Sequence, residues 1–303
     1  MQSEIPGQLT SKLTNNPNRY TKIMDALGFD SSLIADFVEN LYNSEESIDS
    51  WLSLPENEEY REIGKASLAL LLLDCESIIP KRSDDSLYSI LYRNHLKTKK
   101  IEDFSDYNKN ISFITFNYDR TLEHYLFTVL SAKHPSLIEK VMEELNKLKI
   151  LHVYNSFGNL PWQAEVDTIP YFSLWDHTLK RDRPDKFDPF AISGDVRKAS
   201  ENIELMFGDE LTPQFEEARK ILKSSDKIIF MGFGYWDDNL KKLGFDYDTP
   251  WRGKMIRGTA YNVPDARIRQ ISEFTNEILK KENLINAKCH EFIKTIEVEV
   301  RKL

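Results

Sequence analysis

The stretch ISFITFNYDRTLEH, residues 111 to 124, decides how the rest of the chain is interpreted. Its first half, residues 111 to 116, is a short and largely apolar run, which is typical of a strand covered on both faces in a parallel sheet. The run ends abruptly at Asn117, Tyr118 and Asp119, without a glycine or proline at the turn, and a helical pattern follows. A buried strand that ends in an amide, a phenol and a carboxylate predicts either a capped helix or a ligand contact.

Apolar runs and helical patterns alternate after residue 110. This order predicts βαβ units and therefore an α/β fold, with a Rossmann-like, mostly parallel sheet flanked by helices. The predicted strands are 111 to 116, 150 to 157, 226 to 234 and 257 to 263, and the predicted helices are 120 to 131, 136 to 148, 213 to 222 and 264 to 281.

Residues 18 to 105 carry apolar side chains mostly at helical spacing. We therefore expect residues 1–105 to form a helical N-terminal portion packed on the core, and residues 106–303 to form the Rossmann-like domain, in one continuous domain. Residues 163 to 194 have few periodic signals and predict a long connection. The aromatic residues in and beside this connection favour a packed lid or satellite core over a stacking platform; they are Trp162, Tyr171, Phe172 and Trp175.

Charge and composition exclude several classes of protein. The formal net charge of -9 argues against nucleic acid as the main partner, because phosphate binding needs a basic face. The longest apolar run is too short to span a bilayer, and the first residues show no secretory signal. Cys75 and Cys289 are the only cysteines, too few for a disulfide framework or a four-cysteine zinc site. We expect a reduced, cytoplasmic protein without a bound metal or a membrane partner.

Three of the predicted strands end in polar or glycine-containing segments. In open α/β sheets, ligands bind at the carboxyl ends of the strands. The convergence of these segments therefore predicts one ligand site, and the segments are residues 115 to 119, 152 to 158 and 232 to 239.

The segment TFNYD (115 to 119) resembles the Thr-x-Asn-x-Asp motif of the sirtuin superfamily, and it is most similar to the bacterial sirtuin-like NAD-cleaving proteins of antiphage defence. Two further segments resemble the family in the same order: HVYNSFGNLPW matches the strand with a His-Gly pair, and FMGFGYWDDNL matches the glycine loop near the adenosine ribose. RGTAYNV resembles the last strand, which borders the adenine. The resemblance covers residues 110 to 265.

The resemblance implies that NAD or a related dinucleotide is the ligand. It implies that Asn117 holds the ribose and orients a nucleophile, that Asp119 stabilises positive charge or fixes the nicotinamide amide, and that His152 is the general base. The implied cofactor-binding residues are Thr115, Phe116, Tyr118, Tyr154, Gly232, Phe233, Gly234 and Asn239. A homo-oligomer or a partner protein of the defence system is also implied.

The chain departs from the family pattern at two points. No Gly-Ala-Gly-x-Ser phosphate loop precedes Phe113, and Tyr154-Asn155 stands where the family has its His-Gly pair. His152 lies two residues earlier, on the same strand face, and substitutes for that histidine in our interpretation. The zinc ribbon of the deacetylase sirtuins is missing, which disfavours a protein deacylase.

Each assignment has a structural alternative. Asn117 and Asp119 could cap the helix expected to start at Arg120, His152 could be a hydrogen-bonded core histidine, and the glycines could form an ordinary turn. Tyr154 is interpreted as a packing residue. Three functions remain open at this point: an NAD hydrolase, a catalytically inactive sirtuin-like module that binds a nucleotide or a partner, and an unrelated α/β enzyme.

Overall fold

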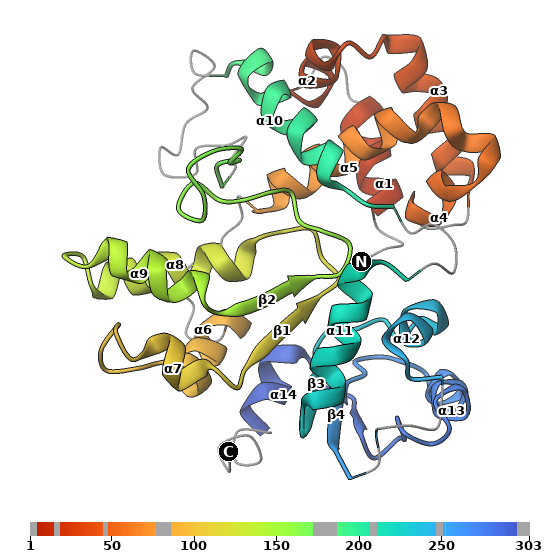
Figure 1. Cartoon of the computed structure of the whole chain (residues 1–303). Coiled ribbons are helices and arrows are strands. Elements are labelled where there is room, and N and C mark those ends of the chain that lie inside the picture. Colours follow the sequence, from red (N-terminus) through yellow and green to blue (C-terminus); the bar gives the residue numbers. More distant parts are fainter. Residues whose placement is uncertain are drawn as a thin grey trace. The chain divides into compact units, whose positions relative to one another are not determined.

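The computed structural model describes residues 5–14, 19–44, 48–76, 86–171, 187–205, 211–246, 251 and 253–295, and the structural statements below concern these residues. The fold is mixed α/β and mostly helical, with two small parallel sheets (Figure 1). The predicted fold class is therefore confirmed at the level of α/β with parallel strands. Phe172 and Trp175, expected in an aromatic cluster, lie outside the described residues.

The chain forms two compact units, each assembled from three segments of sequence. Unit 1 consists of Met1–Ile79, Phe116–Val129 and Tyr154–Gly208, and unit 2 consists of Pro80–Thr115, Leu130–Val153 and Asp209–Leu303. The predicted division at residue 105 stays a prediction. Helix α8 (Thr121–Lys133) begins in unit 1 and ends in unit 2.

Unit 1 is helical, and α5 is its most buried helix. Side chains on all faces of α5 are buried, not only those on one face. Helix α10 packs against α2 and α5 (Figure 1), and α1 packs against α3. The remaining elements of unit 1 follow in chain order: α1 (Ile5–Thr14), α2 (Arg19–Leu27), α3 (Ser31–Asn43), α4 (Ile48–Ser53), the 3-10 helix η1 (Pro55–Tyr60), α5 (Arg61–Glu76) and α10 (Pro189–Asn202).

Helix α10 corrects one prediction. Residues 189 to 194 were expected to belong to a long connection, but they are the first turns of this helix. The Asp188 carboxylate accepts hydrogen bonds from the main-chain N–H groups of Phe190 and Ala191, and Pro189 occupies the first turn. An N-cap followed by proline is a helix start that does not depend on apolar periodicity.

The five strands that the structure describes all lie in unit 2. Its elements are α6 (Leu87–Leu91), the π-helix η2 (Tyr92–Leu96), α7 (Phe104–Asn108), β1 (Ser112–Thr115), α9 (Ile138–Asn146), β2 (Lys149–His152), α11 (Pro213–Ser224), β3 (Lys227–Phe230), α12 (Asp237–Leu243), β4 (Met255–Thr259), α13 (Asp265–Phe274), β5 (Leu284–Ile285) and α14 (Cys289–Thr295).

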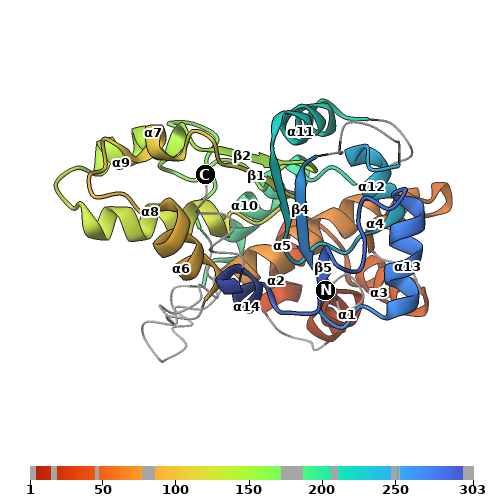
Figure 2. The same cartoon turned by 90° about the horizontal axis from the view of Figure 1, so that it is seen from below.

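The strands pair in parallel within two sheets, β1-β2 and β3-β4-β5. Strands β1 and β2 lie side by side in both views (Figures 1 and 2), with Ser112 opposite Lys149 and Thr115 opposite His152. The expectation that β1 is covered on both faces is wrong: its residues are half-buried or exposed, because the two-stranded sheet leaves it little neighbouring surface.

Several element ends differ from the predicted ones. Strand β2 stops at His152 instead of continuing to residue 157, and α13 stops at Phe274 instead of residue 281. The chain leaves α13 through Asn276 and Glu277, which both have positive φ, 49° and 62°. Strand β5 was not predicted, because two residues carry no detectable alternation.

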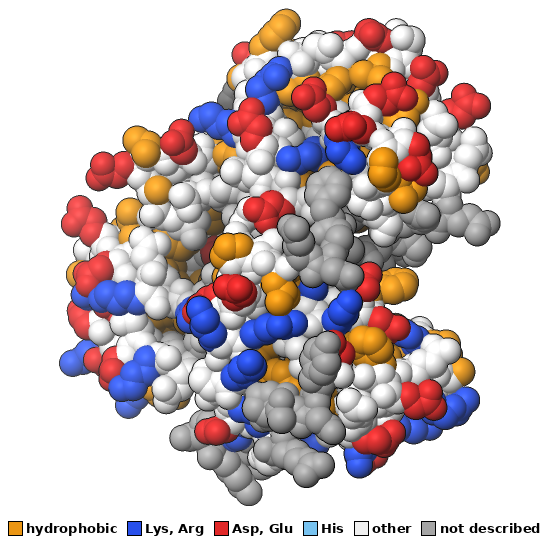
Figure 3. Space-filling view, turned by 45° about the vertical axis from the view of Figure 1, so that its right-hand side comes forward, with side chains coloured by type: hydrophobic (Ala, Val, Ile, Leu, Met, Phe, Trp, Pro, Cys, Tyr) orange, Lys and Arg blue, Asp and Glu red, His pale blue; other side chains and the backbone are white. Residues whose placement is uncertain are grey.

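The surface carries both signs of charge. On the face shown in Figure 3, Lys and Arg side chains are interspersed with Asp and Glu side chains. No helix within the described ranges is long and apolar enough to cross a membrane.

Candidate functional site

The ends of β1 and β2 bring two predicted site residues together in unit 2. Thr115 and His152 are opposite each other at the carboxyl ends of these parallel strands, and the Thr115 carbonyl accepts a hydrogen bond of 3.0 Å from the Val153 N–H. His152 is half-buried.

In unit 1, the residues after β1 alternate between packed and exposed side chains. Phe116 contacts Tyr154 edge to face at 5.9 Å between ring centroids, and Tyr118 stacks on Phe157 at 6.1 Å. The Tyr118 hydroxyl donates a 2.9 Å hydrogen bond to the Glu204 carbonyl. Tyr118 and Tyr154 are therefore packed residues of this unit, 7% and 6% exposed, as was expected for Tyr154.

Asn117 and Asp119 differ from these aromatic neighbours because their side chains are exposed and half-buried, respectively. The Asp119 carboxylate accepts a hydrogen bond of 3.2 Å from the Thr121 N–H. Helix α8 begins at Thr121, one residue later than predicted, so Asp119 stabilises its first turn. The capping role that was considered for Asp119 is thus present.

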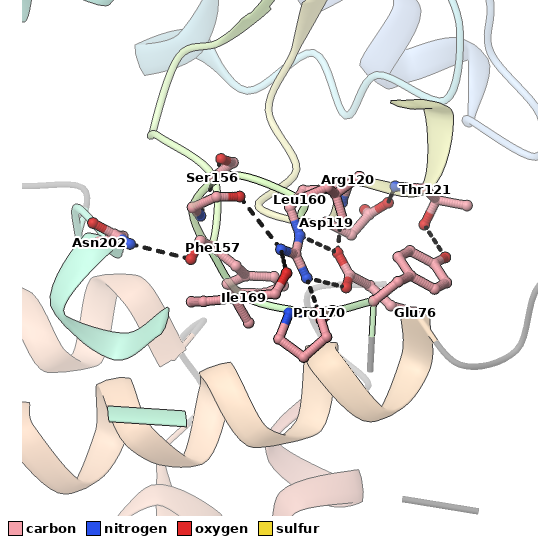
Figure 4. Close-up of polar contacts among 12 residues, drawn as sticks. Glu76, Asp119, Arg120, Thr121, Ser156, Phe157, Leu160, Ile169, Pro170 and Asn202 are labelled. Atoms are coloured by element: carbon pink, nitrogen blue, oxygen red, sulfur yellow. Dashed lines mark hydrogen bonds and ion pairs between the residues drawn. The ribbon is translucent and has the colours of Figure 1, made fainter. Parts of the chain in front are cut away.

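The largest buried polar group beside this segment is the ion pair of Arg120 and Glu76 (Figure 4), in which both residues are 1% exposed. Guanidinium Nη2 lies 2.7 Å from Glu76 Oε2, Nε lies 3.1 Å from Oε1, and the Arg120 main-chain N–H donates to Oε1 at 2.6 Å. Burial raises the pKa of the Glu76 carboxyl above its usual value, although pairing with Arg120 opposes this shift.

The Arg120 guanidinium also binds main-chain carbonyls between residues 158 and 170 of unit 1. Arg120 Nη1 donates to the carbonyl of Ile169 at 2.7 Å and of Gly158 at 3.4 Å, and Nη2 donates to the carbonyl of Pro170 at 3.3 Å (Figure 4). Gly158 has φ of 112°, a conformation that favours glycine. Asn202 holds the same turn, because its side-chain amide donates to the Phe157 carbonyl at 3.1 Å.

Aromatic residues of the predicted connection pack on α8. The Tyr171 ring stacks on His124, with centroids 3.6 Å apart and planes 2° from parallel, and Trp162 stacks on Phe127 at 5.0 Å. The interpretation of Trp162 and Tyr171 as packed residues is confirmed.

Burial, assisted by the nearby Arg120 cation, lowers the pKa of His124 to about 4, so this imidazole is neutral at pH 7.

The glycine segment after β3 forms a tight loop in unit 2. Gly232 has φ of 64° and donates its N–H to Thr259 Oγ1 at 2.8 Å, at the carboxyl end of β4. Tyr235 is fully buried, also with positive φ, and its hydroxyl donates to the Thr259 carbonyl at 3.0 Å. Thr259 therefore binds both ends of the loop.

The other predicted residues of this loop are partly covered. A Cβ atom added to Gly234 would lie 2.8 Å from the Trp236 indole nitrogen, so the indole already occupies the space that this glycine leaves. Phe233 contacts the rings of Phe230 and Tyr235, and Asn239 is buried in α12. The main chain of this loop is exposed at Gly232 and Gly234, whereas Phe233 is half-buried.

No cluster of three metal-ligating side chains occurs among the residues that the structure describes. A cavity of about 450 Å³ lies in unit 2, lined by residues that include Trp251, Lys254 and Ile256. It contains none of the predicted site residues.

The sequence reasoning missed Glu76, Arg120 and Thr259. Arg120 was considered only as the start of a helix, and Glu76 only as part of the helical region of residues 18 to 105. The available signal was the two carboxylates Asp74 and Glu76 at the end of that helix, because buried carboxylates need partners.

Comparison with known proteins returned no match among family models, curated proteins or solved structures.

Proposed function

We propose that the chain binds NAD and hydrolyses the bond between nicotinamide and ribose, releasing nicotinamide and ADP-ribose, and that it acts as a bacterial antiphage-defence effector. In this proposal the strands of the two parallel sheets belong to a Rossmann-like fold, and the polar segments follow their carboxyl ends. The sequence resemblance of residues 110 to 265 supplies the ligand class.

The resemblance assigns the steps of the reaction to Asn117, Asp119 and His152. As the bond to nicotinamide weakens, positive charge develops on the ribose, as it does in glycoside hydrolysis. Asn117 holds the ribose, and Asp119 stabilises the charge. Water adds its oxygen to the anomeric carbon and passes a proton to His152, while the electrons of the broken bond pass to the nicotinamide ring.

The observation that carries the proposal is the rigid support of the segment after β1. The Tyr118 hydroxyl, the Asp119 carboxylate and the Arg120 guanidinium each make hydrogen bonds that fix this short segment, while Asn117 stays exposed. Polar groups that are held in place before the ligand arrives lose little entropy on binding. This is the arrangement expected for a catalytic segment.

The experiment is release of nicotinamide from NAD by the purified chain, compared with Asn117→Ala. We expect release by the unchanged chain and a fall of about 100-fold or more in the variant. Asn110→Ala is the matched control, because Asn110 is an exposed asparagine just before β1. Equal release by the chain and by Asn117→Ala would contradict the assignment of Asn117.

A second candidate is a catalytically inactive module that binds a dinucleotide or a partner protein. The loop after β3 favours it, because the Gly232 N–H is used by Thr259 and the Trp236 indole occupies the space beside Gly234. This candidate predicts that NAD raises the free energy of unfolding by about 2.7 kcal/mol at a hundredfold excess over its dissociation constant, without nicotinamide release. Neither release nor stabilisation would contradict both candidates.

A further inference from the structure

The Arg120–Glu76 pair has more contacts than a helix start requires. Asp119 already accepts from the first N–H of α8. Glu76, from the last turn of α5, nevertheless uses both carboxylate oxygens on Arg120, and one of them also accepts the Arg120 main-chain N–H. The pair therefore fixes the main chain at residue 120 as well as the side chain.

The Arg120 guanidinium also fixes residues 158 to 170 relative to residues 118 to 121. Its Nη1 and Nη2 atoms donate to three main-chain carbonyls, those of Gly158, Ile169 and Pro170 (Figure 4). One cation thereby connects three stretches of unit 1 that are distant in sequence: the end of α5, residues 118 to 121, and residues 158 to 170. The planar, rigid donor fork of arginine suits such a junction.

Stability alone does not explain a buried ion pair at this position. Removing two charges from water is costly, and apolar residues of similar volume often serve stability equally well. The property that an apolar pair lacks is direction, because each guanidinium N–H and each carboxylate oxygen determines where its partner lies. Both Asn117 and Asp119 lie within three residues of Arg120.

We infer that Glu76 and Arg120 are a positioning pair, which holds Asn117 and Asp119 in the geometry that NAD cleavage requires. The inference rests on the proposed function. Neither residue of the pair contacts the reacting atoms: Glu76 acts through Arg120, and Arg120 acts through its own main chain and the carbonyls that it binds.

The test is the double variant Glu76→Gln with Arg120→Met. It removes both charges together and leaves no unpaired ion, and the glutamine keeps an oxygen that accepts the N–H of residue 120. The matched control is Glu58→Gln with Arg61→Met, because these residues form an ion pair of the same two types in unit 1, with side chains 78% and 29% exposed. Circular dichroism and thermal melting establish that each variant is folded before activity is measured.

For nicotinamide release, we expect kcat of the folded double variant to fall about 100-fold, the loss typical of a small misplacement of reacting groups, while KM changes less than about threefold. The control keeps both constants. A folded double variant that keeps kcat within about twofold would overturn the inference, since the pair would then be only structural.

Hydrogen exchange of the amides of residues 117 to 121 separates this inference from the proposed function. If the unchanged chain releases no nicotinamide, the proposed function fails, and amide exchange decides the positioning role instead. Faster exchange of these amides in the folded double variant, at unchanged global stability, would show that the pair orders the segment. Unchanged exchange would overturn the inference.

Discussion

Glu76 and Arg120, 44 residues apart, are joined by three hydrogen bonds in the interior of unit 1, with side-chain exposures of 0% and 1%. In this environment neither charge has water as an alternative partner. Removal of one residue therefore costs more than its hydrogen bonds, because the other charge stays buried and uncompensated.

Single replacements at this pair are expected to destabilise unit 1 strongly. Glu76→Ala leaves a buried guanidinium, and we expect the free energy of unfolding to fall by about 3–5 kcal/mol, measured by chemical denaturation. Glu58→Ala should change it by less than about 1 kcal/mol, because the Glu58 side chain in the pair with Arg61 is 78% exposed. The double variant Glu76→Gln, Arg120→Met should lose less than the sum of its single variants. Additive losses would contradict the ion-pair interpretation.

The lowered pKa of His124 makes the stability of the folded chain depend on pH. Its pKa is lowered from 6.5 to about 4 in the folded chain, so between these values the unfolded chain binds more protons than the folded chain. The free energy of unfolding should therefore fall as the pH drops from 6.5 to 4. The shift corresponds to at most about 3.4 kcal/mol, which we reduce to about 1–2 kcal/mol because the imidazole is only half-buried.

His124→Phe is the matched variant for this measurement. Phenylalanine keeps an aromatic ring against Tyr171, which stacks on His124 at 3.6 Å, but it cannot bind a proton. Denaturation curves at several pH values should show that this part of the pH dependence is absent from the variant. If the two proteins lose the same stability between pH 6.5 and 4, another group titrates in this range.

The sequence predicted those parts of the fold that depend on local patterns. The parallel strand at residues 112 to 115 and the helix at residues 213 to 224 follow from an apolar run and from an N-cap with proline. The same N-cap and proline at Asp188 and Pro189 were overlooked, because the surrounding residues lack apolar periodicity. The two residues of β5 are too few to produce a pattern.

The candidate site was only partly predictable for a different reason. Asn117 and Asp119 are visible in the sequence as a polar interruption directly after an apolar strand. The contacts of Arg120 with Glu76 and with the carbonyls of residues 158 to 170 join positions that are far apart in sequence, and no periodic pattern encodes such pairs. In the loop after β3, the Trp236 indole lies where a Cβ atom of residue 234 would be, which is a tertiary contact that no local pattern encodes.

Two variants of Asp119 separate its hydrogen bond at the start of α8 from its proposed action on the ribose. Asp119→Asn keeps a side-chain oxygen that accepts the Thr121 N–H, so the free energy of unfolding should change by less than about 0.5 kcal/mol. Asp119→Ala removes this acceptor and should cost about 0.5–2 kcal/mol. If the charge of Asp119 acts on the ribose, nicotinamide release should fall in both variants. Release that follows stability, and is kept in Asp119→Asn, would assign Asp119 to the helix start alone.

The packing of the loop after β3 requires glycine at position 258, so we expect a side chain there to destabilise the fold. A Cβ atom added at Gly258 would collide with the Tyr235 hydroxyl and would lie 3.0 Å from Phe230 Cβ. We expect Gly258→Ala to lower the free energy of unfolding by about 1–3 kcal/mol, because this closely packed region cannot absorb a methyl group. Gly194→Ala is the control, since a Cβ there meets nothing within 4 Å, and a helical alanine should leave stability unchanged or raise it by up to about 1 kcal/mol.

Tyr235→Phe tests whether the hydroxyl is the atom responsible. Alone, it removes the hydrogen bond of 3.0 Å to the Thr259 carbonyl and should cost about 0.5–1.5 kcal/mol. Combined with Gly258→Ala, it removes the colliding atom, so the double variant should be more stable than the sum of the two single losses predicts. Chemical denaturation of the four proteins measures this coupling. Strict additivity would mean that the collision with Phe230, and not with Tyr235, determines why residue 258 is glycine.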